Sequence, residues 1–295
     1  MAEKARDIRR RIKSVESTKK ITNAMQLIAA SRILKAQART ERSRPFARAI
    51  GEMIEMLASE TKSSPLLAER DEVSNVGMIV ITGDRGLAGA YNANVLREAQ
   101  RASQREQEAG RKVRITSVGR KGASFFKFRQ VPIAAQFSGV SDAPGYADAK
   151  KVAEGVISDY VSGEVDKVLM AYTDFVSASL QRARVTQILP VPRKEKVPNK
   201  PTGPSASFEF EPEPDALLEA LLPRYVEIKV FSALLESSTS EHASRMRAMK
   251  SATDKADELI NVFALRANKA RQAEITNEIA DIVGGTEALR TASAV

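Results

Sequence analysis

The sequence predicts an α/β fold combined with a long antiparallel coiled coil, in which a small Rossmann-like α/β domain is inserted between an N-terminal and a C-terminal helix. Three observations predict it. The first 60 residues have helical spacing of apolar residues and one proline, Pro45, the last 80 carry a heptad pattern, and the region between them alternates strand-like with helix-like segments. We expect four parts: an N-terminal helix (1–60), the α/β domain (70–192), a proline-rich connector (193–213) and a C-terminal helix (214–295).

The N-terminal helix is predicted by apolar residues separated by steps of four and three. They are Ile8, Ile12 and Val15, followed by Ile21, Met25 and Ile28. We expect a kink near Pro45, because proline removes a backbone hydrogen bond inside a helix. The segment 21–31, "ITNAMQLIAAS", carries no charge although a strongly basic run precedes it.

The C-terminal helix carries a seam in which steps of four and three alternate, as in a left-handed coiled coil. Its members are Leu235, Thr239, His242, Met246, Met249, Thr253, Ala256, Ile260, Phe263, Ala267 and Ala270. If the first helix ends near residue 58 and the last begins near 214, antiparallel pairing places Met25 opposite Met246 or Arg247, and residue 1 opposite Ala270 or Arg271. The remaining residues form an unpaired helix, which we expect to stop at Gly284 and Gly285.

The middle region has β-branched runs of strand length separated by helical patterns. We predict strands over 76–84, 113–119, 165–175 and 183–191, and helices over 91–109 and 146–162. This alternation is typical of a mainly parallel sheet. Seven of the twelve prolines then crowd into residues 190–214, which indicates a connector.

Charge is concentrated at the N-terminus, since residues 1–50 hold 14 Lys or Arg and only 4 Asp or Glu. This helix either faces an acidic partner or has a solvated basic surface, and the charge pattern leaves both open. Cysteine is absent and His242 is the single histidine, which argues against disulfides and a metal site. No apolar run approaches the length that spans a bilayer, so we expect a cytosolic or peripheral protein.

The loop "TGDRGLAGAYN", residues 82–92, follows a predicted strand and opens a helix, where phosphate-binding loops occur. Its glycines Gly83, Gly86 and Gly89 are spaced by three, and it lacks the Lys-Ser/Thr pair of a P-loop. A structural turn is favoured over a dinucleotide site of an oxidoreductase. We identify no catalytic constellation, cofactor site or metal site. A basic nucleic-acid-binding coiled-coil protein is the alternative, although segment 21–31 lacks the cations and aromatic residues such a surface uses.

Three ordered motifs resemble the gamma subunit of F-type ATP synthases over essentially the whole chain. They are "IRRRIKSVESTKKITNAMQLIAASRILKAQ", "TGDRGLAGAYNAN" and "SEHASRMRAMKSATDKADELI" with "ANKARQAEITNEIADIVGG". The resemblance implies a non-catalytic rotor shaft, a foot formed by the α/β domain, and a C-terminal helix that enters the alpha/beta hexamer. One departure is Ala88, where the family often has cysteine.

The same resemblance implies partners and contact residues. The partners are the alpha, beta, epsilon and c subunits, at the cytoplasmic face of a bacterial cell membrane, with no nucleic acid and no small-molecule substrate. Expected contacts with the alpha/beta hexamer are Lys19, Lys20, Met25, Arg32, Lys35, Arg245, Arg271, Gln272 and Thr276. Expected contacts with the c ring or epsilon are Phe208, Glu209, Phe210 and Glu211. Rotation of the c ring, driven by ion flow, would turn the shaft and drive ATP synthesis.

Overall fold

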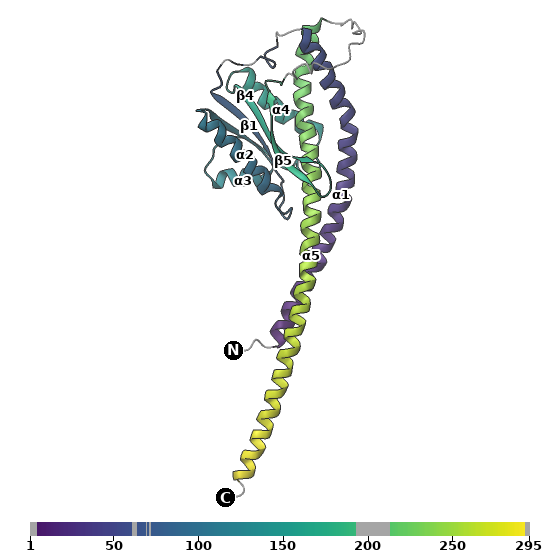
Figure 1. Cartoon of the computed structure of the whole chain (residues 1–295), viewed down its shortest axis with the longest axis vertical. Helices are drawn as coiled ribbons and strands as arrows, with labels where there is room; N and C mark the ends of the chain where they lie inside the picture. Colours follow the sequence, from purple (N-terminus) through teal and green to yellow (C-terminus); the bar gives the residue numbers. More distant parts are fainter. Residues whose placement is uncertain (1–4, 61–63, 69, 71, 193–212, 293–295) are drawn as a thin grey trace, which may run out of the picture. The chain divides into compact units, whose positions relative to one another are not determined.

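A computed structural model describes residues 5–60, 64–68, 70, 72–192 and 213–292. The chain divides into two compact units, unit 1 (Met1–Ile28 with Met246–Val295) and unit 2 (Ala29–Arg245). In chain order the elements are α1 (Ala5–Glu60), β1 (Asn75–Ile81), α2 (Tyr91–Glu108), β2 (Lys112–Val118), α3 (Arg120–Phe128), β3 (Ile133–Phe137), α4 (Tyr146–Val161), β4 (Lys167–Phe175), β5 (Gln181–Leu189) and α5 (Pro214–Ala292) (Figure 1).

Unit 2 is built on a five-stranded mixed sheet with the strand order β3-β2-β1-β4-β5. β1 is parallel to both β2 and β4, and β2 is parallel to β3. β5 closes one edge antiparallel to β4, to which a short turn connects it. The predicted mainly parallel sheet is therefore present, with one antiparallel edge strand.

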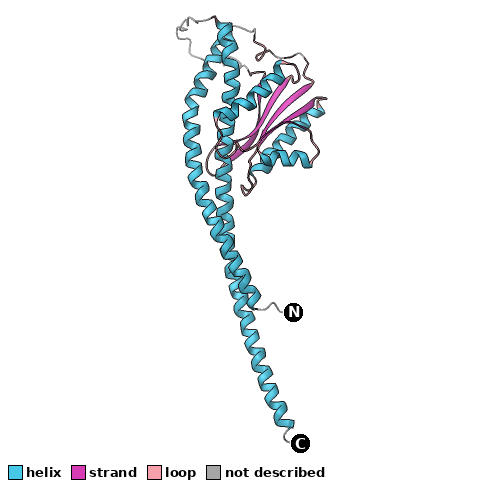
Figure 2. Cartoon of the chain, turned by 180° about the vertical axis from the view of Figure 1, so that it is seen from behind, coloured by secondary structure: helices cyan, strands magenta, loops and turns pink. Residues whose placement is uncertain are grey.

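The sheet is covered on both faces, as Figure 2 shows for the magenta strands between the helices. Alternate side chains of β1 point to opposite faces of the sheet, because successive side chains of a strand point in opposite directions. Val76, Met78 and Val80 pack with α2 and α3, whereas Ile79 and Ile81 belong to the core that contains α4. The run "VGMIVI" is thus apolar throughout because both faces are buried.

The core that contains α4 also includes the parts of α1 and α5 that lie in unit 2. Ile50, Ile54 and Leu57 of α1 are buried in it, as are Leu218, Leu222, Val226 and Leu234 of α5. The sheet therefore holds both long helices through apolar side chains at the same face.

In unit 1, α1 and α5 are paired antiparallel. Thr22 Oγ1 lies 2.7 Å from Thr253 Oγ1, Lys19 forms an ion pair with Asp257, and the Ala5 N–H donates to Glu274 Oε1 at 3.3 Å. The predicted pairing would place Thr22 opposite residue 250. The observed pairing is displaced toward the C-terminus by about one helical turn or more.

The paired face of α5 agrees with the predicted seam, while that of α1 does not agree throughout. Met249, Ala256 and Ala267 are buried, and every residue from 271 to 286 is exposed, so the buried seam ends at Ala270. On α1, Ile21 and Ile28 are exposed and Thr22 is buried in their place. The apolar residues whose spacing predicted the helix therefore do not all lie at its paired face, since Ile21 and Ile28 are at the surface.

The predicted end of the C-terminal helix differs from the structure, and two elements were not predicted. α5 continues through Gly284 and Gly285 to Ala292, because the glycines take part in a helix that their neighbours favour. α3 and β3 were not predicted, since "RKGASFFKF" is short and "IAAQF" has no clear alternation. α1 runs through Pro45 without a break in helix assignment, so a kink there stays a prediction. No helix in the described part of the chain is long and apolar enough to cross a membrane.

Candidate functional site

The glycine-containing loop, residues 82–92, joins β1 to α2, and its first residues are bonded within the protein. The Thr82 N–H donates to Val118 O at 2.8 Å, and the Gly83 N–H donates to Asn92 Oδ1 at 2.8 Å. The Asp84 N–H donates to Ser141 Oγ at 2.9 Å. Because a phosphate-binding loop needs backbone N–H groups directed at the ligand, these three are not available for that purpose.

The Asp84 side chain joins this loop to two other segments of unit 2. It accepts hydrogen bonds from the backbone N–H groups of Arg120 and Ser141, each at 3.1 Å. Burial alone would raise the pKa of Asp84, but the backbone donors outweigh it and hold the pKa below its usual value. Asp84 is therefore an ionised carboxylate that fixes the loop.

Helix α5 places a second carboxylate, that of Glu241, beside the loop. A Cβ added at Gly83 would lie 2.9 Å from the carboxyl carbon of Glu241, so only glycine fits here without a shift. Glu241 is 1% exposed, and burial raises its pKa while Arg245 opposes the rise. A buried carboxylate at this position would repel a pyrophosphate, which argues against the dinucleotide site.

Arg245 is paired with Glu241 inside unit 2. Its guanidinium donates to Glu241 Oε1 and, at 3.3 Å, to the backbone carbonyl of Gly86. The Arg245 side chain is 9% exposed. Arg245 is one of the residues expected at the alpha/beta hexamer, but its buried, paired guanidinium suits a role in holding the glycine loop against α5.

His242 lies beside this pair. Its Nε2 is 3.2 Å from the carbonyl oxygen of Asp142, and a carbonyl can only accept, so Nε2 carries the proton. Burial lowers the pKa of His242, with the charges of Arg245 and Arg32 acting in the same direction. The imidazole is therefore neutral at pH 7. The described residues contain no group of three His, Cys, Asp or Glu side chains that could hold a metal ion.

Small hydroxyl residues complete the junction between α5 and the sheet. Ser240 Oγ donates to Thr173 O at 3.3 Å, the Thr173 N–H donates to Ser237 Oγ at 3.3 Å, and Ser238 Oγ donates to Asp142 O at 3.3 Å. All three serines are buried. Polar side chains this deep require partners, and here the partners are the backbone of β4 and of the loop that precedes α4.

The expected contact residues of α1 have different surroundings. Lys19 is paired with Asp257, and Arg32 Nη1 lies 2.6 Å from Asp142 Oδ2. Lys20 and Lys35 are exposed, and Met25 is half-buried. Two of the four cations are therefore engaged by carboxylates of the same chain, which leaves Lys20 and Lys35 as the more available charges.

The sequence pattern missed an outward-facing apolar stripe on α1. It consists of Ile21, Leu27, Ile28 and Leu34, which are 54% to 69% exposed. Ile21 and Ile28 are seven residues apart, as are Leu27 and Leu34, so each pair is aligned along α1. The separation of Leu27 from Leu34 was visible in the sequence, but spacing within one helix does not show which apolar residues face solvent.

The remaining expected contacts lie at the end of α5 and in the connector. Arg271, Gln272 and Thr276 are all exposed, and Thr276 Oγ1 donates to Gln272 O at 2.9 Å. Ile275, Ile279, Ile282 and Val283 add exposed apolar surface to the same segment. The other predicted contacts, Phe208, Glu209, Phe210 and Glu211, lie outside the described residues.

Comparison with known proteins gives consistent matches over the full chain. The family model described as ATP synthase matches residues 4–289. An ATP synthase gamma chain from Parafrankia sp. is 47% identical over 98% of this chain and 99% of that protein. One from Thermobifida fusca is 44% identical over 100% of this chain and 99% of that protein.

Solved structures agree with these relatives. A chain of the Tetrahymena thermophila mitochondrial ATP synthase central stalk and c ring has a TM-score of 0.60 and 27% identity, and the match covers 79% of this chain and 99% of that one. A chain of the Euglena gracilis mitochondrial ATP synthase, in a structure with OSCP, F1 and the c ring, has a TM-score of 0.66 and 18% identity. That match covers 99% of this chain and 96% of the other, and at this identity it shows the fold alone.

Proposed function

The chain belongs to the ATP synthase gamma-chain family, which makes it a central-stalk subunit, and from this premise we propose that it mechanically couples a rotating membrane ring of c subunits to ATP synthesis in an alpha/beta hexamer. One of the similar solved structures contains a central stalk with the c ring, and the other contains F1 with the c ring. In this proposal the chain makes no chemical bonds and contacts alpha, beta, epsilon and c subunits.

The observation that best supports the proposal is the exposed apolar surface near the C-terminal end of α5. Every residue from 271 to 286 is exposed, and four of them, Ile275, Ile279, Ile282 and Val283, are large and apolar. Isolated helices are marginal in water, so a helix with such a surface is stabilised when a partner covers it. An apolar collar of alpha and beta subunits would cover it.

The outward stripe on α1 supports a contact that permits rotation. Ile21, Leu27 and Ile28 can contact changing neighbours without the directional hydrogen bonds that would fix one orientation. Lys20 and Lys35, which are exposed on the same helix, add attraction to acidic side chains of beta subunits that falls off slowly with distance. Arg271, Gln272 and Thr276 are assigned to the collar.

Coupling follows from contacts that differ between orientations. A shaft can shift the populations of open and closed beta subunits only if it interacts differently with the two states. The chain supplies this asymmetry because, within the described residues, α5 continues to Ala292, well beyond the hydrogen bond from the Ala5 N–H to Glu274. Each beta subunit would thus meet a different side of the shaft in turn.

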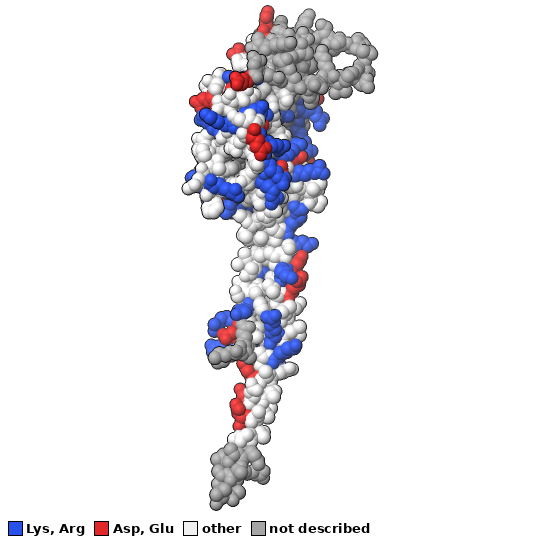
Figure 3. Space-filling model, turned by 60° about the vertical axis from the view of Figure 1, so that its left-hand side comes forward, with Lys and Arg blue, Asp and Glu red and all other residues white. Residues whose placement is uncertain are grey.

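We assign the remaining parts by their place in the chain. The helices 1–60 and 214–295 form a coiled-coil shaft, and 70–192 forms a Rossmann-like foot domain. The connector 193–213, with Phe208, Glu209, Phe210 and Glu211, contacts the c ring or epsilon. On Figure 3, blue Lys and Arg side chains predominate over red ones across the face of unit 2 that is shown. We place the subunit at the cytoplasmic face of a bacterial membrane, bound peripherally through its complex.

Hydrogen exchange tests the collar. Amides of residues 272–284 should exchange fast in the free chain and slowly in the assembled alpha/beta complex, because only the complex covers this helix. Amides in the buried stretch of α5 from Leu222 to Leu234 should be protected in both samples and serve as the internal control. Equal exchange at 272–284 in the two samples would contradict the proposal.

A further inference from the structure

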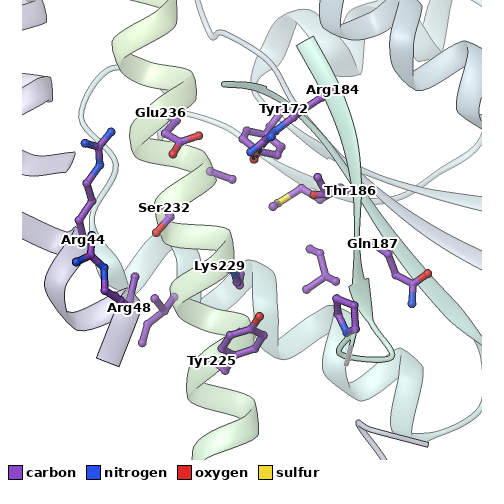
Figure 4. Close-up of a pocket in the computed structure, with 16 residues that line it drawn as sticks. Arg44, Arg48, Tyr172, Arg184, Thr186, Gln187, Tyr225, Lys229, Ser232 and Glu236 are labelled. Atoms are coloured by element: carbon purple, nitrogen blue, oxygen red, sulfur yellow. Dashed lines mark hydrogen bonds between the residues drawn. The ribbon is translucent and has the colours of Figure 1, made fainter. Parts of the chain in front are cut away.

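A cavity of about 480 Å³ lies in unit 2 between α1, α5 and the edge strand β5. Figure 4 shows Arg44 and Arg48 of α1 on one side of it and Tyr172 and Arg184 of the sheet on the other. The volume is within the range of small-molecule sites, which is about 300–1,000 Å³. None of the residues assigned above to contacts with other subunits lines it.

The cavity is lined by an excess of positive charge. Arg44 and Arg48, four residues apart on α1, are on the same face of the helix, and within the described residues neither forms a hydrogen bond or ion pair. Arg184 and Lys229 contribute two more cations from β5 and α5. Like charges at this spacing repel, and an anion between them would relieve the repulsion.

The other polar groups of the cavity restrict the chemical class of ligand that it can bind. Arg184 is already engaged, because it donates to Tyr172 Oη at 2.6 Å and is partly neutralised by the Asp174 carboxylate, which lies 3.6 Å away. Lys229 is also engaged, since its ammonium lies 5.1 Å from the centre of the Tyr225 ring, so the Arg44 and Arg48 guanidiniums carry the recognition. Guanidinium groups suit phosphate oxygens because they can donate two parallel hydrogen bonds. Two guanidiniums on the same helix face, each able to bind two oxygens, suit the two phosphate groups of a diphosphate better than a single phosphate.

Glu236 is the acidic member of the cavity, and its charge would oppose an anion. Asp174 of β4, Arg184 of β5 and Arg44 of α1 are the charged groups that act on it. Burial and the Asp174 carboxylate raise the pKa of Glu236 to about 7, so near neutral pH about half of the population is uncharged. A protonated carboxyl can donate to a phosphate oxygen.

We propose that this cavity, the Arg44 pocket, binds the diphosphate group of a small soluble anion such as inorganic pyrophosphate or a nucleoside diphosphate. Arg44 and Arg48 hold the phosphate oxygens. This binding is additional to the rotor function and uses different residues.

Calorimetric titration of the full chain with pyrophosphate and with ADP tests the pocket, with Arg44→Gln/Arg48→Gln as the test variant. Arg39→Gln/Arg42→Gln is the matched control, since it removes the same charge from exposed positions of α1 outside the pocket. We expect both ligands to bind the unmodified chain, the test variant to bind about tenfold or more weakly, and the control to change by less than about threefold.

A third variant, Glu236→Gln, should bind pyrophosphate several-fold more tightly, because it removes a negative charge and keeps a donor. A damaged fold would not increase the affinity. The proposal is overturned if the two double variants lose the same affinity, or if pyrophosphate does not bind.

A separate experiment uses vesicles that contain phosphatidic acid. Vesicle binding that the test variant loses, without pyrophosphate binding, would overturn a soluble ligand in favour of a lipid headgroup.

Discussion

Gly83 in the β1–α2 loop lies directly against the buried carboxylate of Glu241 on α5, and a Cβ at position 83 would approach that carboxyl group to 2.9 Å. Glu241 cannot easily withdraw, because it is 1% exposed and bonded to Arg245. The close approach therefore holds the long helix against the loop of the α/β domain.

Gly83→Ala should lower the free energy of unfolding by roughly 1–3 kcal/mol, since overpacking forces side chains from their preferred positions. Thermal unfolding of the free chain measures it. Gly86→Ala is the matched control in the same loop, because its added Cβ would meet Lys121 Cε at an ordinary 3.7 Å. Equal losses in the two variants would show that Glu241 is not responsible.

The Glu241–Arg245 pair predicts a second, non-additive effect. Arg245→Met leaves a buried carboxylate without its cation and should destabilise the chain by about 3 kcal/mol or more. The double variant Arg245→Met/Glu241→Gln should recover a large part of this loss, since it removes the unpaired charge. Urea unfolding of the single and double variants completes the comparison.

The exposed pair of Arg101 with Glu98 provides a reference, because their side chains are 63% and 31% exposed. Arg101→Met should cost less than about 1 kcal/mol. A double variant at 241 and 245 as unstable as Arg245→Met alone would argue that lost packing, not the uncompensated charge, explains the effect.

Glu236 predicts a pH dependence of stability. Burial and the Asp174 carboxylate raise its pKa from 4.5 to about 7 in the folded chain. The folded state therefore holds this proton more tightly than the unfolded state, and stability falls as the pH rises from about 4.5 to about 7. Above that interval the full penalty of the buried charge is present.

Glu236→Gln should consequently stabilise the chain at pH 8 by on the order of 2 kcal/mol and have little effect at pH 5. Thermal midpoints at the two pH values measure the difference. Glu219→Gln, at an exposed position of the same helix, should show no such contrast. A gain that is the same at pH 5 and pH 8 would exclude titration of Glu236 as the cause.

Some features could be predicted from sequence because a single local pattern controls them. The run 76–81 of β1 has no polar side chain since both faces of the sheet are buried, and the seam of α5 ends at Ala270 because exposure begins at Arg271. The register of α1 against α5 could not be predicted as well. It depends on cross-helix contacts such as Thr22 with Thr253, which no spacing within one helix reveals.

The candidate site shows the same limit. The glycine loop was recognisable as a turn, yet its contact with Glu241 joins residues 158 positions apart in the chain. Burial of Arg245 also depends on that contact, so a motif alone suggested an external role for it. The outward stripe with Leu27 was hidden because Thr22, a polar residue, takes the inward position beside it.

Met25→Lys tests the shaft contact. Met25 is half-buried on α1, and a lysine there can bury its stem and place the ammonium group at the surface, so the chain should fold and assemble. An ion pair with an acidic side chain of a beta subunit would favour one orientation by roughly 1 kcal/mol, which corresponds to about fivefold in a rate. ATP hydrolysis should persist while proton pumping per ATP falls.

Inverted vesicles allow both quantities to be measured on one preparation, by fluorescence quenching for pumping and by phosphate release for hydrolysis. Met25→Gln is the matched control, since it adds polarity of similar size without charge. Rising ionic strength should restore pumping in the lysine variant, because salt screens an exposed ion pair. Normal coupling in Met25→Lys at low salt, or equal loss in Met25→Gln, would show that no acidic partner reaches this position of the shaft.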